Sequence, residues 1–427
     1  MDYGQTIHYL YNKLPLYSTI GIKAYKADLN NTIALCEYLG DPQNKIKTIH
    51  IAGTNGKGSA SHMLAAVFQQ SGYNTGLYTS PHLKDFRERI KLNGEMIPQD
   101  FVIDFVERTK TFSNEINPSF FELTFVMALE YFAQQKVDIA IIETGLGGRL
   151  DSTNVITPEV AIITNIGFDH MDILGDTIEK IATEKAGIIK QNIPVIIGET
   201  LPSTKTIFLE KAAEKNAPVF FAEEAFKIIS ATPVSEKLEV EILPNNTAKT
   251  KIYNLDLPAL YQAKNLRTVL TALDVLQNKY LLKEENIKYA LSHVKDITGL
   301  HGRWEVIQRN PLVVLDVAHN VDGIQQLINQ INNSSYKALH IVFGMVKDKE
   351  IEKVLELLPK NATYYFTKAQ IPRALPEEEL LQRAQKFNLT GSSYDEVNKA
   401  LNAAMDTATE EDMIIVCGSV FVVGEVN

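Results

Sequence analysis

The chain has 427 residues, of which 45% are hydrophobic and 22% are charged, and its formal net charge is -10. This composition is typical of a globular protein of two or three domains, large enough to fold without disulfides or a structural metal. The acidic balance argues against a nucleic-acid-binding surface, although a few local lysines or a helix terminus could still bind an anionic small molecule.

No export or membrane signal is visible in the sequence. The first residues, MDYGQTIHYLYNKLPLY, lack the charged-then-apolar order of a signal peptide, and no window approaches the roughly 18 consecutive apolar residues of a membrane span. Cys36 and Cys417 lie far apart and in no CxxC spacing, so we expect buried thiols in a reducing compartment. A cytoplasmic protein without membrane or nucleic-acid partners is expected, and the acidic surface is consistent with a monomer.

Short β-branched runs alternate with helical patterns in the first two thirds of the chain, which predicts a mostly parallel sheet covered on both faces. Expected strands occupy 48–52, 75–79, 137–143, 160–164 and 194–198, and expected helices lie near 57–71, 120–135 and 176–190. Residues 219–256 do not follow this alternation of strands and helices. EKLEVEIL alternates and TKIYNLDL follows an Asn-rich turn, which predicts a small antiparallel hairpin region.

The alternation of strands and helices restarts after a boundary in the chain. A helix is expected near 262–278, and DITGLHGRW at 296–304 is typical of a domain boundary. Further strands are expected at 312–316, 339–344, 363–367 and 413–418. The sequence therefore predicts two α/β domains, residues 1–297 and the smaller 298–427.

A phosphate-binding loop is expected where the strand at 48–52 meets the helix at 57–71. It reads Gly53-Thr54-Asn55-Gly56-Lys57-Gly58-Ser59. Glycines let backbone N–H groups approach a phosphate, the helix N-terminus adds partial positive charge, Lys57 reaches the terminal phosphates and Ser59 is placed to assist. A strand-to-helix turn without a ligand is the alternative.

The spacing of this loop departs from GxxxxGK[ST]. Only two residues separate Gly53 from Gly56, and Gly58 intervenes between Lys57 and Ser59. The loop is therefore unlike that of a switch GTPase or a motor, and the hydroxyl that a magnesium ion needs could come from elsewhere.

Acidic and imidazole side chains follow the next expected strands, at the sheet edge where ligands of α/β proteins collect. Glu143 suits Mg²⁺, which takes one or two carboxylates plus phosphates and water, but it could equally cap a neighbouring loop. Asp169, His170 and Asp172 follow the strand at 160–164, and His170 could be a metal ligand or a hydrogen-bonded loop histidine. The helix beyond carries three lysines that are most simply solvated: Lys180, Lys185 and Lys190.

The second domain repeats this arrangement. Asp316 ends a strand, and His319 and Asn320 lead into a helix, so a structural hydrogen-bond set and a substrate contact both stay open. No Ser/His/Asp or Cys/His set stands out as a nucleophile. The expected chemistry is positioning and charge neutralisation around a phosphate, as phosphoryl transfer requires.

Eight motifs, in order over nearly the whole chain, resemble those of one family. GTNGKGS (53–59), TSPHLKDFRERIKLNGEMI (79–97), ETGLGGRLDSTN (143–154) and FDHMDILGDTIEKIATEKAGIIK (168–190) are similar to folylpolyglutamate synthase/dihydrofolate synthase, a relative of the Mur ligases. HGRWE (301–305), DVAHN (316–320), IPRALP (371–376) and GSVFVVGE (418–425) extend the resemblance into the second domain.

The resemblance implies a Mur-ligase-like α/β fold, with a P-loop ATP-binding domain at 1–297 and a Rossmann-like glutamate ligase domain at 298–427. It implies a ligase that uses ATP and Mg²⁺. ATP phosphorylates the carboxylate of dihydropteroate, or of the terminal glutamate of a folate, and the amine of L-glutamate then displaces phosphate from the acyl phosphate. The alternative is another Mur-like amino-acid ligase acting on a different carboxylate. A nucleotide-binding switch would need a longer phosphate loop and guanine-reading motifs, and neither is present.

The resemblance also implies roles for single residues. Gly53 to Ser59 would hold the ATP phosphates, Ser80 and Glu143 would hold one Mg²⁺, and His170 would hold a second. Lys185 matches a lysine that is carbamylated by CO₂, which turns an amine into a carboxylate-like group able to face Mg²⁺, and burial favours the neutral amine that this requires. The catalytic residues would be Lys57, His170 and Lys185, and further nucleotide-binding residues would be Asn265, Arg303, Asp316 and His319.

One stretch departs from the family pattern. Relatives often carry Gly-x-His-Gln before the nucleotide-contacting asparagine, whereas this chain has Ala259, Tyr261 and Gln262. Asn265 is retained, so the helix is expected to keep its role, and the adenine-side contact is not carried over to Tyr261.

Overall fold

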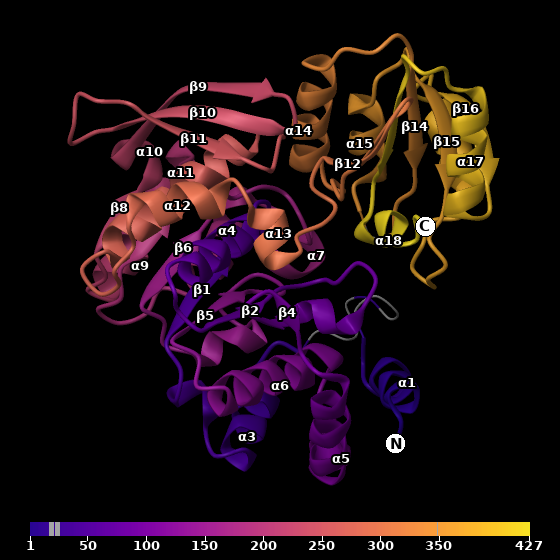
Figure 1. The fold of residues 1–427 in the computed structure, drawn as a ribbon. Helices are drawn as coiled ribbons and strands as arrows, with labels where there is room; N and C mark the ends of the chain where they lie inside the picture. Colours follow the sequence, from indigo (N-terminus) through magenta and orange to yellow (C-terminus); the bar gives the residue numbers. More distant parts are fainter. Residues whose placement is uncertain (17–20, 22–25, 348) are drawn as a thin grey trace. The chain divides into compact units, whose positions relative to one another are not determined.

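The computed structural model describes residues 1–16, 21, 26–347 and 349–427, which fall into two compact units (Figure 1). The first unit contains the N-terminal helix, residues 26–167 and residues 171–300. The second contains residues 301–427 and the short segment 168–170, whose neighbours in sequence belong to the first unit. Among the described residues, no helix has both the length and the apolar character needed to cross a membrane.

An eight-stranded sheet forms the centre of the first unit, in the order β4-β3-β2-β5-β1-β6-β7-β8. The strands from β2 to β8 in this order run parallel, and β3 and β4 add an antiparallel edge. The strands are β1 (Thr48–Ala52), β2 (Thr75–Tyr78), β3 (Ile90–Leu92), β4 (Glu95–Met96), β5 (Ile139–Glu143), β6 (Val160–Ile163), β7 (Val195–Ile197) and β8 (Val219–Phe221).

Helices cover both faces of this sheet, and β5 shows why. Its side chains alternate between two cores: Ile139 and Ile141 pack with α4 and α11, whereas Ala140 and Ile142 pack with α5 and α6. A parallel strand buried on both faces reads as a continuous apolar run.

The helices of the first unit are α1 (Tyr3–Lys13), α3 (Asn30–Tyr38), α4 (Lys57–Gln70), α5 (Gln99–Ile116), α6 (Phe120–Gln134), α7 (Met171–Leu174), α8 (Ile178–Ala186), α9 (Pro202–Glu214), α10 (Ala222–Ala225), α11 (Gln262–Leu276), α12 (Glu284–Leu291) and α13 (Val294–Thr298), with 3-10 turns η2 (Pro42–Asn44), η3 (Phe86–Arg89) and η4 (Ser152–Val155).

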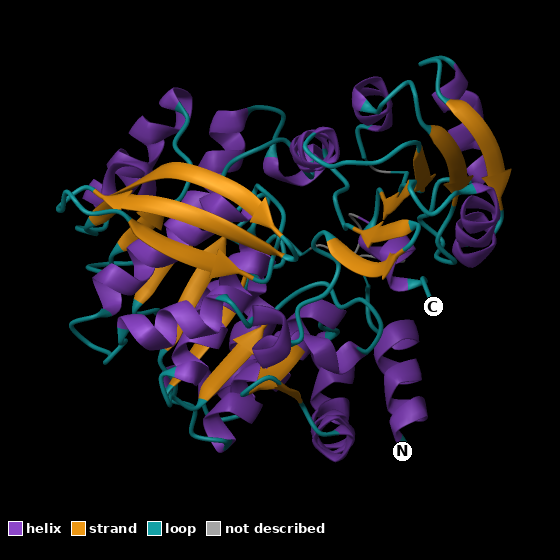
Figure 2. Ribbon diagram, turned by 45° about the horizontal axis from the view of Figure 1, so that its top comes forward, coloured by secondary structure: helices purple, strands orange, loops and turns teal. Residues whose placement is uncertain are grey.

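The predicted hairpin region forms a separate antiparallel sheet of three strands, visible in Figure 2. The strands are β9 (Phe226–Val234), β10 (Lys237–Pro244) and β11 (Lys251–Leu255), and β10 packs on α11 in the same core as α4. The hairpin of β10 and β11 confirms the sequence prediction. The prediction missed β9, an edge strand that is mostly exposed and contains Pro233, and it wrongly assigned β8 to the hairpin region.

The second unit is a six-stranded sheet in the order β12-β13-β17-β14-β15-β16, parallel except for β12. The four strands expected here are β13, β14, β15 and β17, whereas the edge strands β12 and β16 are partly exposed and were missed. Its elements are β12 (Glu305–Arg309), β13 (Leu312–Leu315), α14 (Val321–Asn332), β14 (Leu339–Phe343), α15 (Ile351–Leu357), β15 (Thr363–Thr367), α16 (Glu377–Gln385), β16 (Thr390–Tyr394), α17 (Val397–Thr407), β17 (Met413–Cys417) and α18 (Val420–Gly424). The expected α/β class, with a mostly parallel sheet and a small antiparallel region, is confirmed.

A buried amine on β3 fixes the chain where the first unit ends. Lys91 is 5% exposed, and its Nζ donates to Thr298 O at 2.7 Å and to Gly299 O at 3.1 Å. Burial lowers the pKa of this amine. We expect Lys91→Met to reduce the free energy of unfolding by about 1–3 kcal/mol, because two carbonyl groups lose their donor. Urea denaturation measures this change, with the exposed Lys283→Met as control, and equal stability of the two variants would contradict it.

Candidate active site

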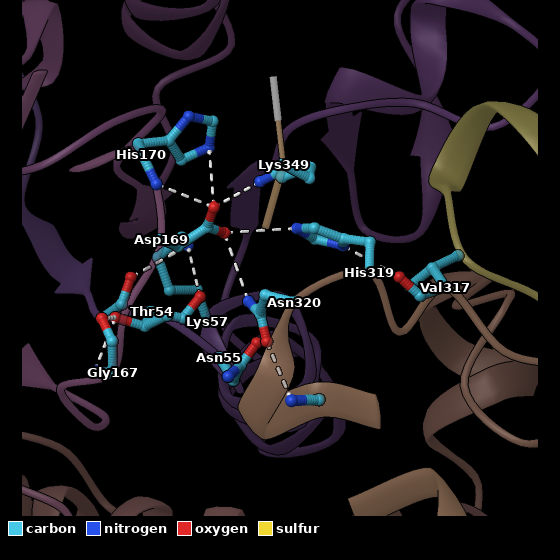
Figure 3. A network of polar contacts seen from close by, with 12 residues as sticks. Thr54, Asn55, Lys57, Gly167, Asp169, His170, Val317, His319, Asn320 and Lys349 are labelled. Carbon is cyan, nitrogen blue, oxygen red and sulfur yellow. Dashed lines mark hydrogen bonds and ion pairs between the residues drawn. The ribbon is translucent and has the colours of Figure 1, made fainter. Parts of the chain in front are cut away.

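The loop between β1 and α4 is braced by residues that follow β6. Thr54 N donates to Asn165 O at 3.1 Å, and Asn55 N donates to Asn165 Oδ1 at 2.8 Å. The Thr54 hydroxyl lies against the backbone of Gly167, donating to its carbonyl and accepting from its N–H, both at 3.0 Å (Figure 3). The loop therefore has a fixed backbone, which is the first requirement for a set of N–H groups that binds phosphate.

Two glycines of the loop occupy positions where a side chain would not fit. A Cβ on Gly53 would lie 1.9 Å from Thr164 Oγ1, and a Cβ on Gly56 would lie 2.3 Å from Asn265 Oδ1. Gly56 has φ 83°, a left-handed conformation, and directly precedes α4. The close approach of Asn265 to the loop agrees with its expected place at a nucleotide, and the contact itself stays a prediction.

Gly56→Ala should therefore weaken ATP binding about tenfold. The added methyl would displace Asn265, and left-handed backbone disfavours alanine by roughly 1–2 kcal/mol. Gly72→Ala is the matched control, because Gly72 has φ 88° but no heavy atom within 4 Å of its Cβ position. Calorimetric titration with an ATP analogue measures the affinity of both variants. An equal loss in both variants would show a general loss of stability and would contradict a specific effect at the loop.

Two lysines expected to be catalytic meet at one carbonyl of the loop. Lys57 Nζ donates to Gly53 O at 3.0 Å and to Thr54 O at 3.2 Å. Lys185, in α8 and only 3% exposed, donates to the same Gly53 O at 2.8 Å. The Lys185 side chain is thus not a solvated helix-face lysine, which was the simplest interpretation of its sequence context. Lys185 lies 132 positions from Gly53 in the sequence, so the fold places a second amine beside the loop.

Ser59 and Asn265 are joined through Gln262. Gln262 Nε2 donates to Ser59 Oγ at 3.1 Å, and Asn265 Nδ2 donates to Gln262 Oε1 at 2.8 Å. All three residues are buried, and the chain links the first turn of α4 to the first turn of α11. Gln262 therefore couples a residue of the phosphate loop to an expected nucleotide contact.

Ser80 and Glu143 lie together at the carboxyl ends of the neighbouring parallel strands β2 and β5. Ser80 N donates to Glu143 Oε2 at 3.2 Å, and Glu143 is 4% exposed. In the described part of the chain, no group of three or more His, Cys, Asp and Glu side chains is arranged to hold a metal ion. A hydroxyl and one carboxylate beside a phosphate loop fit Mg²⁺, which completes its shell with phosphate oxygens and water.

In the second unit, charged and polar side chains converge on the Asp169 carboxylate (Figure 3). Lys349 forms an ion pair with Oδ1, and Oδ2 is approached by His319 Nε2 at 3.3 Å and Asn320 Nδ2 at 3.2 Å. Burial alone would raise the pKa of Asp169, but the charge of Lys349 holds it well below its ordinary range. His170, with φ 50°, places its Nε2 3.8 Å from Asp169 Oδ1.

This cluster brings together Asp169 and His170 with His319 and Asn320, which lie in two separate sequence motifs. It contains His170 and His319, two expected site residues, and Lys349, which the sequence did not single out because an isolated lysine in a loop carries no pattern. The role of His170 as a ligand of a second metal ion, separate from the one expected at Ser80 and Glu143, stays a prediction.

Asp316 and Arg303 also lie in the second unit. Asp316 is buried and accepts hydrogen bonds from Trp304 N at 3.0 Å and Ala318 N at 2.9 Å, while Arg303 Nη1 donates to Gly302 O at 3.2 Å. Asp316 therefore fixes the turn that carries Arg303, which supports the structural interpretation of this aspartate. A contact of either side chain with nucleotide stays a prediction.

Comparisons with known proteins match this architecture along the chain. The Mur ligase middle domain model matches residues 51–273, and the Mur ligase glutamate ligase domain model matches residues 302–420. Folylpolyglutamate synthase of Lacticaseibacillus casei is 32% identical over 444 residues, with 100% of this chain and 98% of the relative covered. Dihydrofolate synthase/folylpolyglutamate synthase of Bacillus subtilis (strain 168) is also 32% identical, with 94% of each chain covered. The chain belongs to the folylpolyglutamate synthase/dihydrofolate synthase family.

Solved structures of this family share the fold. E. coli FolC in complex with DHPP and ADP has a TM-score of 0.86 and 30% identity, with 99% of this chain and 96% of that chain covered. A bifunctional folylpolyglutamate synthase/dihydrofolate synthase with Mn, AMPPNP and L-glutamate bound has a TM-score of 0.84 and 28% identity, with 99% and 97% covered. The resemblance inferred from eight motifs is confirmed, and so is the Mur-ligase-like fold.

Proposed function

We propose that this chain is an ADP-forming ligase that adds L-glutamate to a pterin-containing carboxylic acid, either dihydropteroate or the γ-carboxylate of a folate glutamate. The observation that carries the proposal is the full-length similarity to E. coli FolC, whose structure was solved with DHPP and ADP. The braced loop with two lysines on Gly53 O supports the nucleotide half of the reaction. ATP-dependent glutamate ligation is the activity of this family.

The reaction has two steps. The acceptor carboxylate attacks the γ-phosphorus of ATP and releases ADP, which leaves an acyl phosphate. The amine of L-glutamate then attacks the acyl carbon, an amide forms, and inorganic phosphate leaves. Binding and alignment carry most of the catalysis, because phosphoryl transfer gives the protein little covalent chemistry to do.

The chain's own residues supply that alignment. The N–H groups of the loop and the N-terminus of α4 bind phosphate oxygens, and the Lys57 ammonium, at the first position of α4, neutralises charge that grows on the transferred group. Ser80, Glu143 and His170 would hold divalent metal, which when bound neutralises phosphate charge. Asn265, Arg303, Asp316 and His319 are proposed nucleotide contacts, and Lys185 is the proposed site of carbamylation.

The domain assignment belongs to the same proposal. We assign ATP binding to residues 1–297 and the glutamate ligase role to residues 298–427, as the two matched domain models support. We also propose a cytoplasmic monomer, on the composition and the acidic charge. Light scattering after gel filtration tests the monomer, and a mass of twice 47.8 kDa would contradict it.

A side-by-side acceptor assay tests the function. The purified protein is supplied with ATP, Mg²⁺ and L-glutamate, together with dihydropteroate or tetrahydrofolate, and ADP and the glutamylated product are measured. We expect ADP and amide product in equal amounts with at least one acceptor. If both acceptors are inert, the proposed function is wrong, and ADP release that depends on a different carboxylic acid would favour another Mur-like ligase.

A further inference from the structure

Arg89 holds the loop that carries Ser80 from both sides. This loop, residues 79–82, leaves the carboxyl end of β2. Arg89 O accepts a hydrogen bond from Thr79 N at 3.1 Å, and Arg89 Nε donates to His82 Nδ1 at 2.7 Å. Ser80 therefore lies between two attachments to one residue, which restrain the loop on either side of it.

The far side of His82 is fixed as well. His82 Nε2 lies 3.1 Å from the Tyr11 hydroxyl, in α1. Because Nδ1 accepts from Arg89, the neutral ring carries its proton on Nε2 and donates to Tyr11. Arg89 and Tyr11 thus hold the two ring nitrogens of His82 from opposite sides. Tyr11 stacks on the ring, with centroids 6.2 Å apart.

The buried charge of Arg89 has no ion-pair partner among the described residues. The residue is 7% exposed, and among the described residues no carboxylate oxygen lies within 4.0 Å of its guanidinium. Burial lowers the pKa of the guanidinium, and nearby negative charge that includes Glu143 acts in the opposite direction. Burying a cation without a paired carboxylate lowers the stability of the fold. An apolar side chain would fill the same space without this cost, so packing alone does not explain an arginine here. Its guanidinium instead lies over Phe120, 5.2 Å from the ring centroid.

We propose that Arg89 is a positioning residue of the metal–ATP site: it fixes the 79–82 loop so that the Ser80 hydroxyl and the Glu143 carboxylate stay in register for a divalent cation. Ser80 N donates to Glu143 Oε2, so a shift of the loop moves both candidate ligands at once. The inference rests on the proposed function, because it takes Ser80 and Glu143 as metal ligands. Arg89 holds the ring of His82, His82 in turn holds the end of the loop, and Tyr11 supports His82 from its far side.

The test is the affinity for Mn²⁺, measured by electron paramagnetic resonance on the full chain with AMPPNP present. Arg89→Lys keeps the positive charge but loses the fixed Nε donor to His82. We expect its dissociation constant for Mn²⁺ to rise about 10- to 100-fold, as for residues that orient metal ligands. The affinity for ADP without metal should change less than twofold. Arg87→Lys is the matched control, because Arg87 lies in the same turn η3 but pairs with Asp85.

The results separate positioning from general stability. Wild-type Mn²⁺ affinity in a folded Arg89→Lys variant overturns the inference, and so does an equal loss of Mn²⁺ and metal-free ADP binding. If Arg89→Lys does not fold, Tyr11→Phe tests the outer support of the same chain. It removes the hydroxyl beside His82 Nε2 and should weaken Mn²⁺ binding in the same direction by a smaller factor. Unchanged Mn²⁺ affinity in Tyr11→Phe then overturns the inference.

Failure of the inference is distinct from failure of the proposed function. A wild-type chain that binds no Mn²⁺ with AMPPNP would contradict the proposed function itself. A wild-type chain that binds Mn²⁺, next to an Arg89→Lys variant that binds it equally well, would contradict only the role of Arg89.

Discussion

Lys57→Ala should abolish nearly all turnover, with kcat reduced about 10³-fold, while the protein stays folded. One preorganised charge on a transferred phosphoryl group contributes on the order of 10²- to 10³-fold to kcat, and removal of its bonds to Gly53 O and Thr54 O also loosens the loop. Alanine is a good helix former at the first position of α4, so the helix should persist. ADP release in the acceptor assay measures the loss.

Two comparisons make this result specific. Lys45→Ala removes an exposed lysine before β1 and should retain wild-type turnover. A Lys57→Ala variant that keeps more than a tenth of wild-type kcat would show that the loop binds nucleotide without help from this ammonium. A nucleotide-binding protein without ligase activity would show binding but no product in any variant.

Replacement of Lys185 should have the second large effect. The buried amine donates to Gly53 O, so in Lys185→Met the loop loses a donor and the proposed carbamate is lost as well. We expect kcat to fall about 10²- to 10³-fold, as for loss of one fixed group at the transferred phosphate. Lys185→Arg keeps a cation near the loop but cannot form the carbamate, so it should be equally inactive if carbamylation is required.

A spectroscopic measurement separates the two roles of Lys185. Wild-type protein in ¹³C-bicarbonate should show a bound carbamate carbon by NMR, and Lys185→Met should lack it. Lys180→Met is the matched control, because Lys180 lies five residues earlier on α8 and pairs with Asp176 at the surface. An active Lys185→Arg variant without the signal would show that Lys185 acts only as a donor to the loop.

Elements of the fold with a clear local sequence pattern were predicted correctly. The strand at 48–52, the loop and the helix beginning at Lys57 follow one another as glycines, a lysine and an amphipathic run, and each was found within two residues. Buried parallel strands such as β5 were found because both faces are apolar. The edge strands β9, β12 and β16 were missed, because their exposed residues lack the apolar periodicity on which the prediction depends.

The contacts that build the site depend on distant residues, and no spacing rule reaches them. Lys185 meets Gly53 across 132 positions and Gln262 meets Ser59 across 203, so the sequence alone could not distinguish Lys185 from a solvated lysine. The pairing of Ser80 with Glu143 was expected only through the family resemblance, since the strand-end position of Glu143 left a loop cap equally open and the local context of Ser80 carries no metal-ligand pattern. The two hydrogen bonds of Arg89 to the 79–82 loop were not expected at all, because Arg89 comes close to this loop only when β2 and β3 pair.

The alternating burial of β5 ties catalysis to folding in a way that bears on protein engineering. Since Ile139 to Ile142 serve two cores in turn and Glu143 comes next, an insertion or deletion of one residue in this strand would turn each apolar side chain to the wrong core and remove the carboxylate from its edge. Such a change would prevent folding, so its effect on activity could not be measured. Attempts to alter acceptor choice should therefore leave this strand intact and vary the loops beyond it.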